Sequence, residues 1–110
     1  MDRELVMYIR SFHCPSVSIA TSVLLNAAVP YREIIVDTDP VAKAWLLENV
    51  GFMSVPTLVI ADSGQDTPHT EPEPLPAGQS PRGVDRGPVI TEPRSEQLKD
   101  WLRKQGFIDN

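Results

Sequence analysis

The chain has 110 residues and 41% hydrophobic residues, which is typical of one globular domain spanning residues 1–110. The formal net charge of −5, without any cluster of lysine and arginine, argues against a nucleic-acid partner, because phosphate binding needs a basic face. The longest mildly apolar stretch, residues 17–29, is interrupted by polar residues and is too short to span a bilayer. We therefore expect neither nucleic acid nor a membrane as a partner.

Five elements are predicted in the first 61 residues. The apolar run 5–9 predicts a buried strand. Apolar residues at helical spacing predict a helix over residues 16–28, with one face made of Val17, Ala20, Leu24 and Ala27 or Ala28. The β-branched residues in 31–36 predict a second strand, followed by a helix over 41–49 and a third strand over 57–61. The second helix is expected to pack on the sheet through Val41, Ala44, Trp45 and Leu47.

The composition changes between residues 62 and 93. This segment holds seven of the eleven prolines, four of the six glycines and a local charge of −4, with hardly any large apolar residue before Val84. It is interpreted as a flexible acidic insertion at about residues 62–88, and its prolines 72, 74 and 76 fit either a solvated linker or a polyproline ligand. A short fourth strand is predicted at 89–91, and a last helix from Ser95 to about Gln105 with Leu98, Trp101 and Leu102 on one face.

The order of these elements predicts a four-stranded mixed sheet with helices on both faces. Strands that are joined by helices are expected to be parallel, and the long connection between the last two strands permits an antiparallel pair. The fold class is therefore α/β.

Cys14 is the only cysteine, so an internal disulfide is excluded and a metal site is not expected. It stands where the first strand ends and the first helix begins, and Pro15 suits the first helical position. Helix N-termini carry unpaired N–H groups and a partial positive charge that favour an anion, so this thiol should ionise more readily than free cysteine. The alternative is a small buried hydrophobic residue.

Two segments carry a resemblance to a known family. Residues 8–17, Tyr-Ile-Arg-Ser-Phe-His-Cys-Pro-Ser-Val, resemble the strand, basic residue, aromatic and Cys-Pro-x-Cys sequence of glutaredoxins, and residues 50–58 resemble their Gly-x-x-Thr-Val-Pro turn. The resemblance implies a thioredoxin fold of the glutaredoxin-like type, in which the insertion lies between strands 3 and 4. It also implies a cis Val55–Pro56 bond and a turn that presents the Val55 backbone to an extended peptide or a small thiol beside Cys14.

Two departures from the family pattern bear on mechanism. Val17 occupies the place of the second cysteine of dithiol members, so the chemistry would be monothiol. The stretch Thr91–Ser95 replaces the usual Gly-Gly and aspartate, which puts the Glu92 carboxylate where an anionic ligand would bind.

The predicted site centres on Cys14 as the catalytic thiol. Arg10 is expected either to supply charge or to be an ordinary solvated residue, Phe12 to contact substrate, and His13 to favour the thiolate. The full set of supporting or substrate-binding residues is Arg10, Phe12, His13, Pro15, Val55, Pro56 and Ser95.

These features predict a monothiol glutaredoxin-like thiol–disulfide oxidoreductase that acts on mixed disulfides. No tightly bound cofactor is expected. The predicted co-substrate is glutathione or another low-molecular-weight thiol, and the partners are protein mixed disulfides and a reductase. A monomer is expected, and a cytoplasmic location, because residues 1–4 lack the zones of a signal peptide. The alternatives are a non-catalytic thioredoxin-fold binding module and, less favoured, an iron–sulfur cluster carrier.

Overall fold

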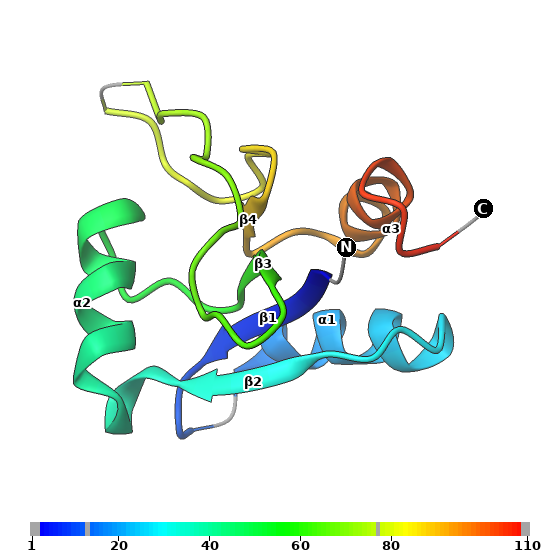
Figure 1. The fold of residues 1–110 in the computed structure, drawn as a ribbon, viewed down its shortest axis with the longest axis horizontal. Coiled ribbons are helices and arrows are strands. Elements are labelled where there is room, and N and C mark those ends of the chain that lie inside the picture. Colours follow the sequence, from blue (N-terminus) through cyan, green and yellow to red (C-terminus); the bar gives the residue numbers. More distant parts are fainter. Residues whose placement is uncertain (1–2, 13, 77, 109–110) are drawn as a thin grey trace.

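A computed structural model describes residues 3–12, 14–76 and 78–108 and confirms the predicted order of elements (Figure 1). Within these residues, no helix is long and apolar enough to cross a membrane. The elements are β1 (Arg3–Ile9), α1 (Pro15–Asn26), β2 (Arg32–Ile35), the 3-10 helix η1 (Val36–Thr38), α2 (Pro40–Asn49), β3 (Thr57–Asp62), β4 (Val89–Thr91) and α3 (Ser95–Lys104).

The four strands form one mixed sheet in the order β2-β1-β3-β4. β1 and β2 are parallel, whereas β3 is antiparallel to both β1 and β4, so the expectation of a parallel third strand is wrong. The reason lies in α2, which runs across the end of β2 rather than back along the sheet (Figure 1). The chain therefore re-enters the sheet at the end where it left, and Thr57 at the start of β3 pairs with Tyr8 near the end of β1.

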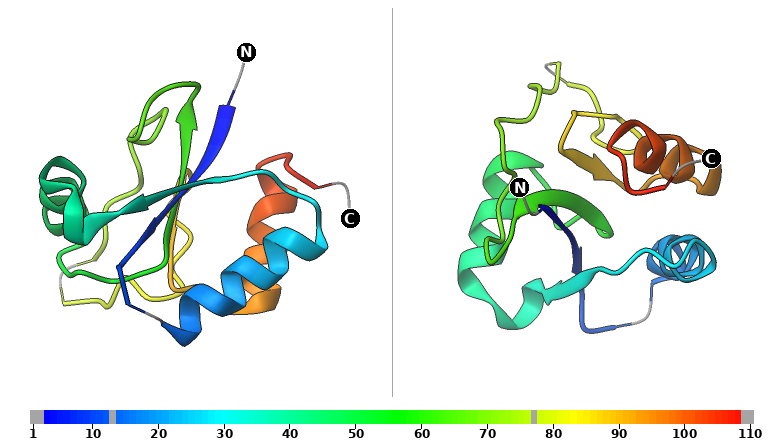
Figure 2. Two further views of the ribbon diagram at one scale, coloured as in Figure 1. Left: turned by 90° about the horizontal axis from the view of Figure 1, so that it is seen from below. Right: turned by 45° about the vertical axis from the view of Figure 1, so that its right-hand side comes forward.

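The two faces of the sheet bury separate hydrophobic clusters. α1 and α3 cover one face and α2 covers the other (Figure 2). Side chains alternate between the faces along β1, as strand geometry requires: Leu5 and Met7 join the cluster under α1 and α3, and Val6 and Tyr8 join the one under α2. Burial on both faces explains why residues 5–9 of β1 are a continuous apolar run rather than alternating.

The helices bear out the predicted faces to different degrees. α3 buries Leu98, Trp101 and Leu102, as predicted, and α1 buries Ala20 and Leu24 as expected together with Val23. The predicted face of α2 is wrong. Its buried residues are Ala42 and Leu46, with Trp45 half-buried, while Val41 and Leu47 are exposed. Positions 42 and 46, followed by the buried Val50, are four residues apart and form a single stripe, which the predicted set does not.

The acidic segment after β3 is tied to the fold at several points. The buried Arg86 donates Nε–H to the Glu73 carbonyl at 2.7 Å and Nη1–H to the carbonyl of Asn49, the last residue of α2, at 2.8 Å. Trp101 Nε1 donates to the Gly87 carbonyl at 2.8 Å. The second half of the segment thus contacts α2 and α3; its flexibility stays a prediction.

Candidate functional site

Cys14 is the N-cap residue of α1. Its backbone is extended, with φ −135° and ψ 124°, and Pro15 takes the first helical turn, as predicted. The Cys14 carbonyl accepts hydrogen bonds from Val17 N–H at 3.0 Å and Ser18 N–H at 3.2 Å, which closes the first turn of the helix. The half-buried side chain lies at the positive end of a twelve-residue helix. This position favours a negative charge on the sulfur.

The turn before β3 faces this sulfur. The Val55–Pro56 bond is cis, as the resemblance implied, and the Val55 carbonyl oxygen lies 4.0 Å from Cys14 Sγ. Thr57 holds the turn, because its hydroxyl donates to the Ser54 carbonyl at 2.8 Å. Two parts of the chain that are about forty residues apart therefore meet at one thiol.

A carboxylate fixes the loop between β1 and α1. Asp37, in η1, accepts hydrogen bonds from Ser11 N–H at 2.8 Å and Ser11 Oγ–H at 2.7 Å, and pairs with Arg10 Nε at 3.1 Å. The Ser11 backbone and hydroxyl bonds, followed by the Arg10 guanidinium, hold the pKa of the Asp37 carboxyl below its usual value of 3.8. The Arg10 guanidinium also lies 4.6 Å from the centre of the Phe12 ring. The charge of Arg10 is thus offset by the Asp37 carboxylate of η1.

Two hollows open beside Cys14. The first, which we call the Val55 groove, has a volume of about 380 Å³, and its walls include Arg10, Phe12, Phe52, Val55 and Glu92. The second, the helix groove, has a volume of about 420 Å³ and runs along α1 past Val17, Ser18 and Thr21. Cys14, Arg10 and Phe12 line both. The sulfur therefore stands where the two grooves meet.

Aromatic side chains border the Val55 groove on both sides. Phe12 is 55% exposed and Phe52 is 60% exposed, and Met53 adds a flexible apolar surface. Large apolar residues left in solvent beside a nucleophile offer contact area to a substrate. The predicted contact of Phe12 with substrate stays a prediction.

Glu92 lines the Val55 groove from the end of β4. It follows β4, and its N–H donates to the Pro56 carbonyl at 2.8 Å, so it is tied to the same turn as Val55. Its backbone has φ +45°, a left-handed conformation that favours glycine. Its carboxylate lies 3.7 Å from Arg82 Nε.

The structure brings most of the predicted site residues together. Arg10, Phe12 and Val55 line a groove with Cys14, and Pro56 forms the buried turn beside them. Pro15 is exposed at the start of α1, and Ser95 begins α3 without lining either groove. The prediction for His13 lies outside the described residues.

The sequence interpretation did not assign Asp37, Phe52 or Met53 to the site, and it named Glu92 only as a departure from the family pattern near the ligand. Phe52 and Met53 lie within the quoted segment 50–58, so their place beside Val55 and Pro56 was a usable signal. Asp37 precedes α2 but does not cap it, because the cap is Asp39, whose Oδ1 accepts from Ala42 N–H at 3.0 Å. Among the described residues, no group of three or more His, Cys, Asp or Glu side chains is placed to hold a metal ion.

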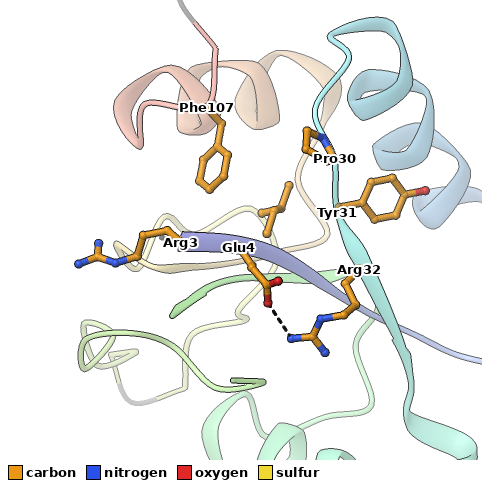
Figure 3. A pocket seen from close by; sticks show the side chains of 7 residues that line it. Arg3, Glu4, Pro30, Tyr31, Arg32 and Phe107 are labelled. Atoms are coloured by element: carbon orange, nitrogen blue, oxygen red, sulfur yellow. Dashed lines mark hydrogen bonds and ion pairs between the residues drawn. The ribbon is translucent and has the colours of Figure 1, made fainter. Parts of the chain in front are cut away.

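A further hollow of about 260 Å³ lies near the start of β1 (Figure 3). Arg3, Glu4, Pro30, Tyr31 and Phe107 line it, and an ion pair of 3.2 Å joins the neighbouring Arg32 to Glu4. Arg32 also pairs with Asp66 at 2.7 Å and so ties β2 to the loop after β3. Cys14 follows the other end of β1, so this hollow is separate from the thiol.

The fold and the thiol beside a Val-Pro turn define a small thioredoxin-fold protein of the thiol-exchange type. The family model described as glutaredoxin matches residues 5–64, which include β1, Cys14 and the whole turn before β3. The chain belongs to the glutaredoxin family. No curated protein and no solved structure matches the chain. At the family level, membership supports thiol oxidoreductase chemistry, with glutathione as the co-substrate of glutaredoxins and with thiols and protein mixed disulfides as partners.

Proposed function

We propose that this protein is a monothiol thiol–disulfide oxidoreductase in which Cys14 is the nucleophile. The observation that carries the proposal is the position of Cys14 Sγ: at the N-terminus of α1, 4.0 Å from the Val55 carbonyl oxygen, where two grooves meet. With one cysteine in the chain, both half-reactions pass through the same sulfur.

The first half-reaction is attack of the Cys14 thiolate on one sulfur of a mixed disulfide. A new bond forms between Cys14 Sγ and the small thiol, the original disulfide bond breaks, and the protein thiol leaves as a thiolate that takes a proton from solvent. In the second, a second small thiolate attacks the sulfur bound to Cys14, forms a disulfide of the two small thiols and releases the Cys14 thiolate. The N-terminus of α1 stabilises Cys14 as attacking anion and as leaving group.

The two grooves would hold the two sides of the disulfide. The Val55 groove offers the backbone of the turn and two exposed aromatic rings, which suits an extended peptide added beside Val55. The helix groove offers the hydroxyls of Ser18 and Thr21 next to Val17. Glutathione or another low-molecular-weight thiol would serve as the co-substrate.

The Cys14→Ser substitution tests this mechanism. Wild-type protein should reduce a mixed disulfide of glutathione in a turnover assay, and C14S should show no rate above that of glutathione alone. A matched control, S63A, changes an exposed serine after β3 and should keep the wild-type rate. Turnover by C14S would refute the mechanism.

A binding module without catalysis would give a different result. Mass spectrometry of wild-type protein after brief exposure to glutathione disulfide should find one glutathione per chain, bound at Cys14, and reduced glutathione should remove it. A chain that forms no adduct under these conditions, although Cys14 is half-exposed, would favour the binding module.

A further inference from the structure

We propose that Glu92 is a specificity-determining residue that makes the site prefer disulfides with a positive charge close to the sulfur. The inference rests on the proposed role of Cys14 and adds a substrate class to it. It is based on the position of Glu92, which lines the same groove as Cys14 and Val55.

The position of Glu92 is set by the backbone and does not depend on a flexible loop. Its N–H donates to the Pro56 carbonyl at 2.8 Å, directly after the pairing of β3 with β4. The Thr57 and Thr91 hydroxyls, 3.0 Å apart and buried, hold the two strands together just before it. The carboxylate therefore comes from a fixed point beside the turn that faces the sulfur.

The uncompensated charge in the Val55 groove is negative. Among the residues that the structure describes, the charged residues of its walls are Arg10 and Glu92. Arg10 is hydrogen-bonded to Asp37 of η1 at 3.1 Å and lies over the Phe12 ring, so its charge is offset by that carboxylate. Glu92 has an ion pair of 3.7 Å with Arg82, which is longer than a hydrogen bond, and the Arg82 side chain is 68% exposed. Solvent screens such a pair, so the charge of Glu92 is the less compensated of the two.

The Glu92 side chain is only 22% exposed, which strengthens its effect on a bound group. A charge that is partly withdrawn from water acts through a lower effective dielectric than a fully solvated one. Phe12, Phe52 and Val55 add apolar surface to the walls of the same groove. A substrate that carries an ammonium or guanidinium group a few atoms from the sulfur thus gains attraction, and one with a carboxylate there is repelled.

Three small disulfides of equal chain length test the inference. They are the symmetrical disulfides of 2-aminoethanethiol, 2-mercaptoethanol and 3-mercaptopropionic acid, in which an ammonium, a hydroxyl or a carboxylate lies two carbons from the sulfur. The measurement is the rate constant for transfer of one thiol to Cys14, followed by mass spectrometry at low salt. In each reaction the Cys14 thiolate forms one sulfur–sulfur bond and a small thiolate leaves, so electrons balance.

The decisive quantity is the ratio of the cationic to the anionic rate constant, compared between variants so that intrinsic differences among the disulfides cancel. One unit charge about 7 Å away changes a rate about threefold in water, so E92Q should lower the ratio about tenfold. R82Q should raise the ratio, because it removes the partner of Glu92. E96Q, an exposed carboxylate on α3, should leave it unchanged.

An independent readout needs no variant. Raising the salt concentration of the wild-type reaction should bring the ratio toward its E92Q value, since salt screens the interaction. A ratio that is the same in wild type and E92Q, and that does not change with salt, would overturn the inference while leaving the proposed function intact. Failure of all three disulfides to modify Cys14 would overturn both.

Discussion

Arg86 is expected to contribute more to stability than any other charged residue of the segment between β3 and β4. It is 7% exposed, and in the described part of the chain both partners of its guanidinium are backbone carbonyls, those of Glu73 and Asn49. Asn49 is the last residue of α2, where the helix dipole favours a cation. Burial lowers the Arg86 pKa, which is the cost of withdrawing the guanidinium from water.

The Arg86→Met substitution keeps the apolar stem and removes the guanidinium. Each hydrogen bond to a charged group contributes about 1.5–3 kcal/mol, and relief of the desolvation cost offsets part of the loss. We therefore expect R86M to lower the free energy of unfolding by about 2–3 kcal/mol. Urea denaturation followed by tryptophan fluorescence measures the change. The control is R82M, at an arginine 68% exposed, for which we expect less than about 0.5 kcal/mol.

Limited proteolysis adds a local readout to the same experiment. If Arg86 ties the segment to α2, trypsin should cleave R86M faster than wild type at Arg82, a site that both proteins retain. An R86M protein that is as stable as R82M, with unchanged cleavage at Arg82, would show that the segment is an independent linker and that the buried contacts contribute nothing.

Three further predictions concern titration and packing. D37N should make the free energy of unfolding less dependent on pH in acid. The lowered pKa of the Asp37 carboxyl stabilises the folded protein above the unfolded value of 3.8, and this contribution is lost as the pH falls below it. The free energy of unfolding should therefore fall less steeply in D37N than in wild type between about pH 4 and pH 2, and an unchanged slope would contradict the Ser11 contacts. Y8F should remove a loss of stability that wild type shows above about pH 10. Burial, followed by the nearby Asp66 carboxylate, raises the pKa of the Tyr8 phenol, so the unfolded chain loses this proton first as the pH rises. Identical thermal melts of the two proteins at alkaline pH would refute this. W101A should cost about 3–5 kcal/mol in urea denaturation, since Trp101 is 1% exposed, and a cost below about 1 kcal/mol would mean that α3 is not packed as described.

Local patterns were sufficient to predict the elements but not the direction of β3. The apolar run of β1 and the stripe of Leu98, Trp101 and Leu102 on α3 are set by burial of neighbours in sequence, so periodicity finds them. Strand direction depends on which end of the sheet α2 crosses, and nothing in residues 57–61 encodes that. The phase of α2 was missed for a similar reason, because its apolar residues occur on more than one side and only packing selects Ala42 and Leu46.

The site was predictable where its residues form short motifs. Cys14 with Pro15, and Val55 with Pro56, lie in contiguous segments, and their pairing across the fold followed from the resemblance. Asp37 was not predicted, because its role arises from contact with Ser11, 26 residues away. The place of Glu92 near the ligand followed from the resemblance, whereas its position in one groove with Cys14 depends on the pairing of β4 with β3.

The most direct test of the account is the rate of Cys14 alkylation by iodoacetamide at pH 7, compared between the folded chain and the chain in concentrated urea. The reagent reports a single site, because the chain has one cysteine. If the fold activates Cys14, alkylation should be faster in the folded protein than in urea, although the side chain is half-buried in the fold. An equal or slower rate in the folded protein would contradict the central claim that the fold activates Cys14.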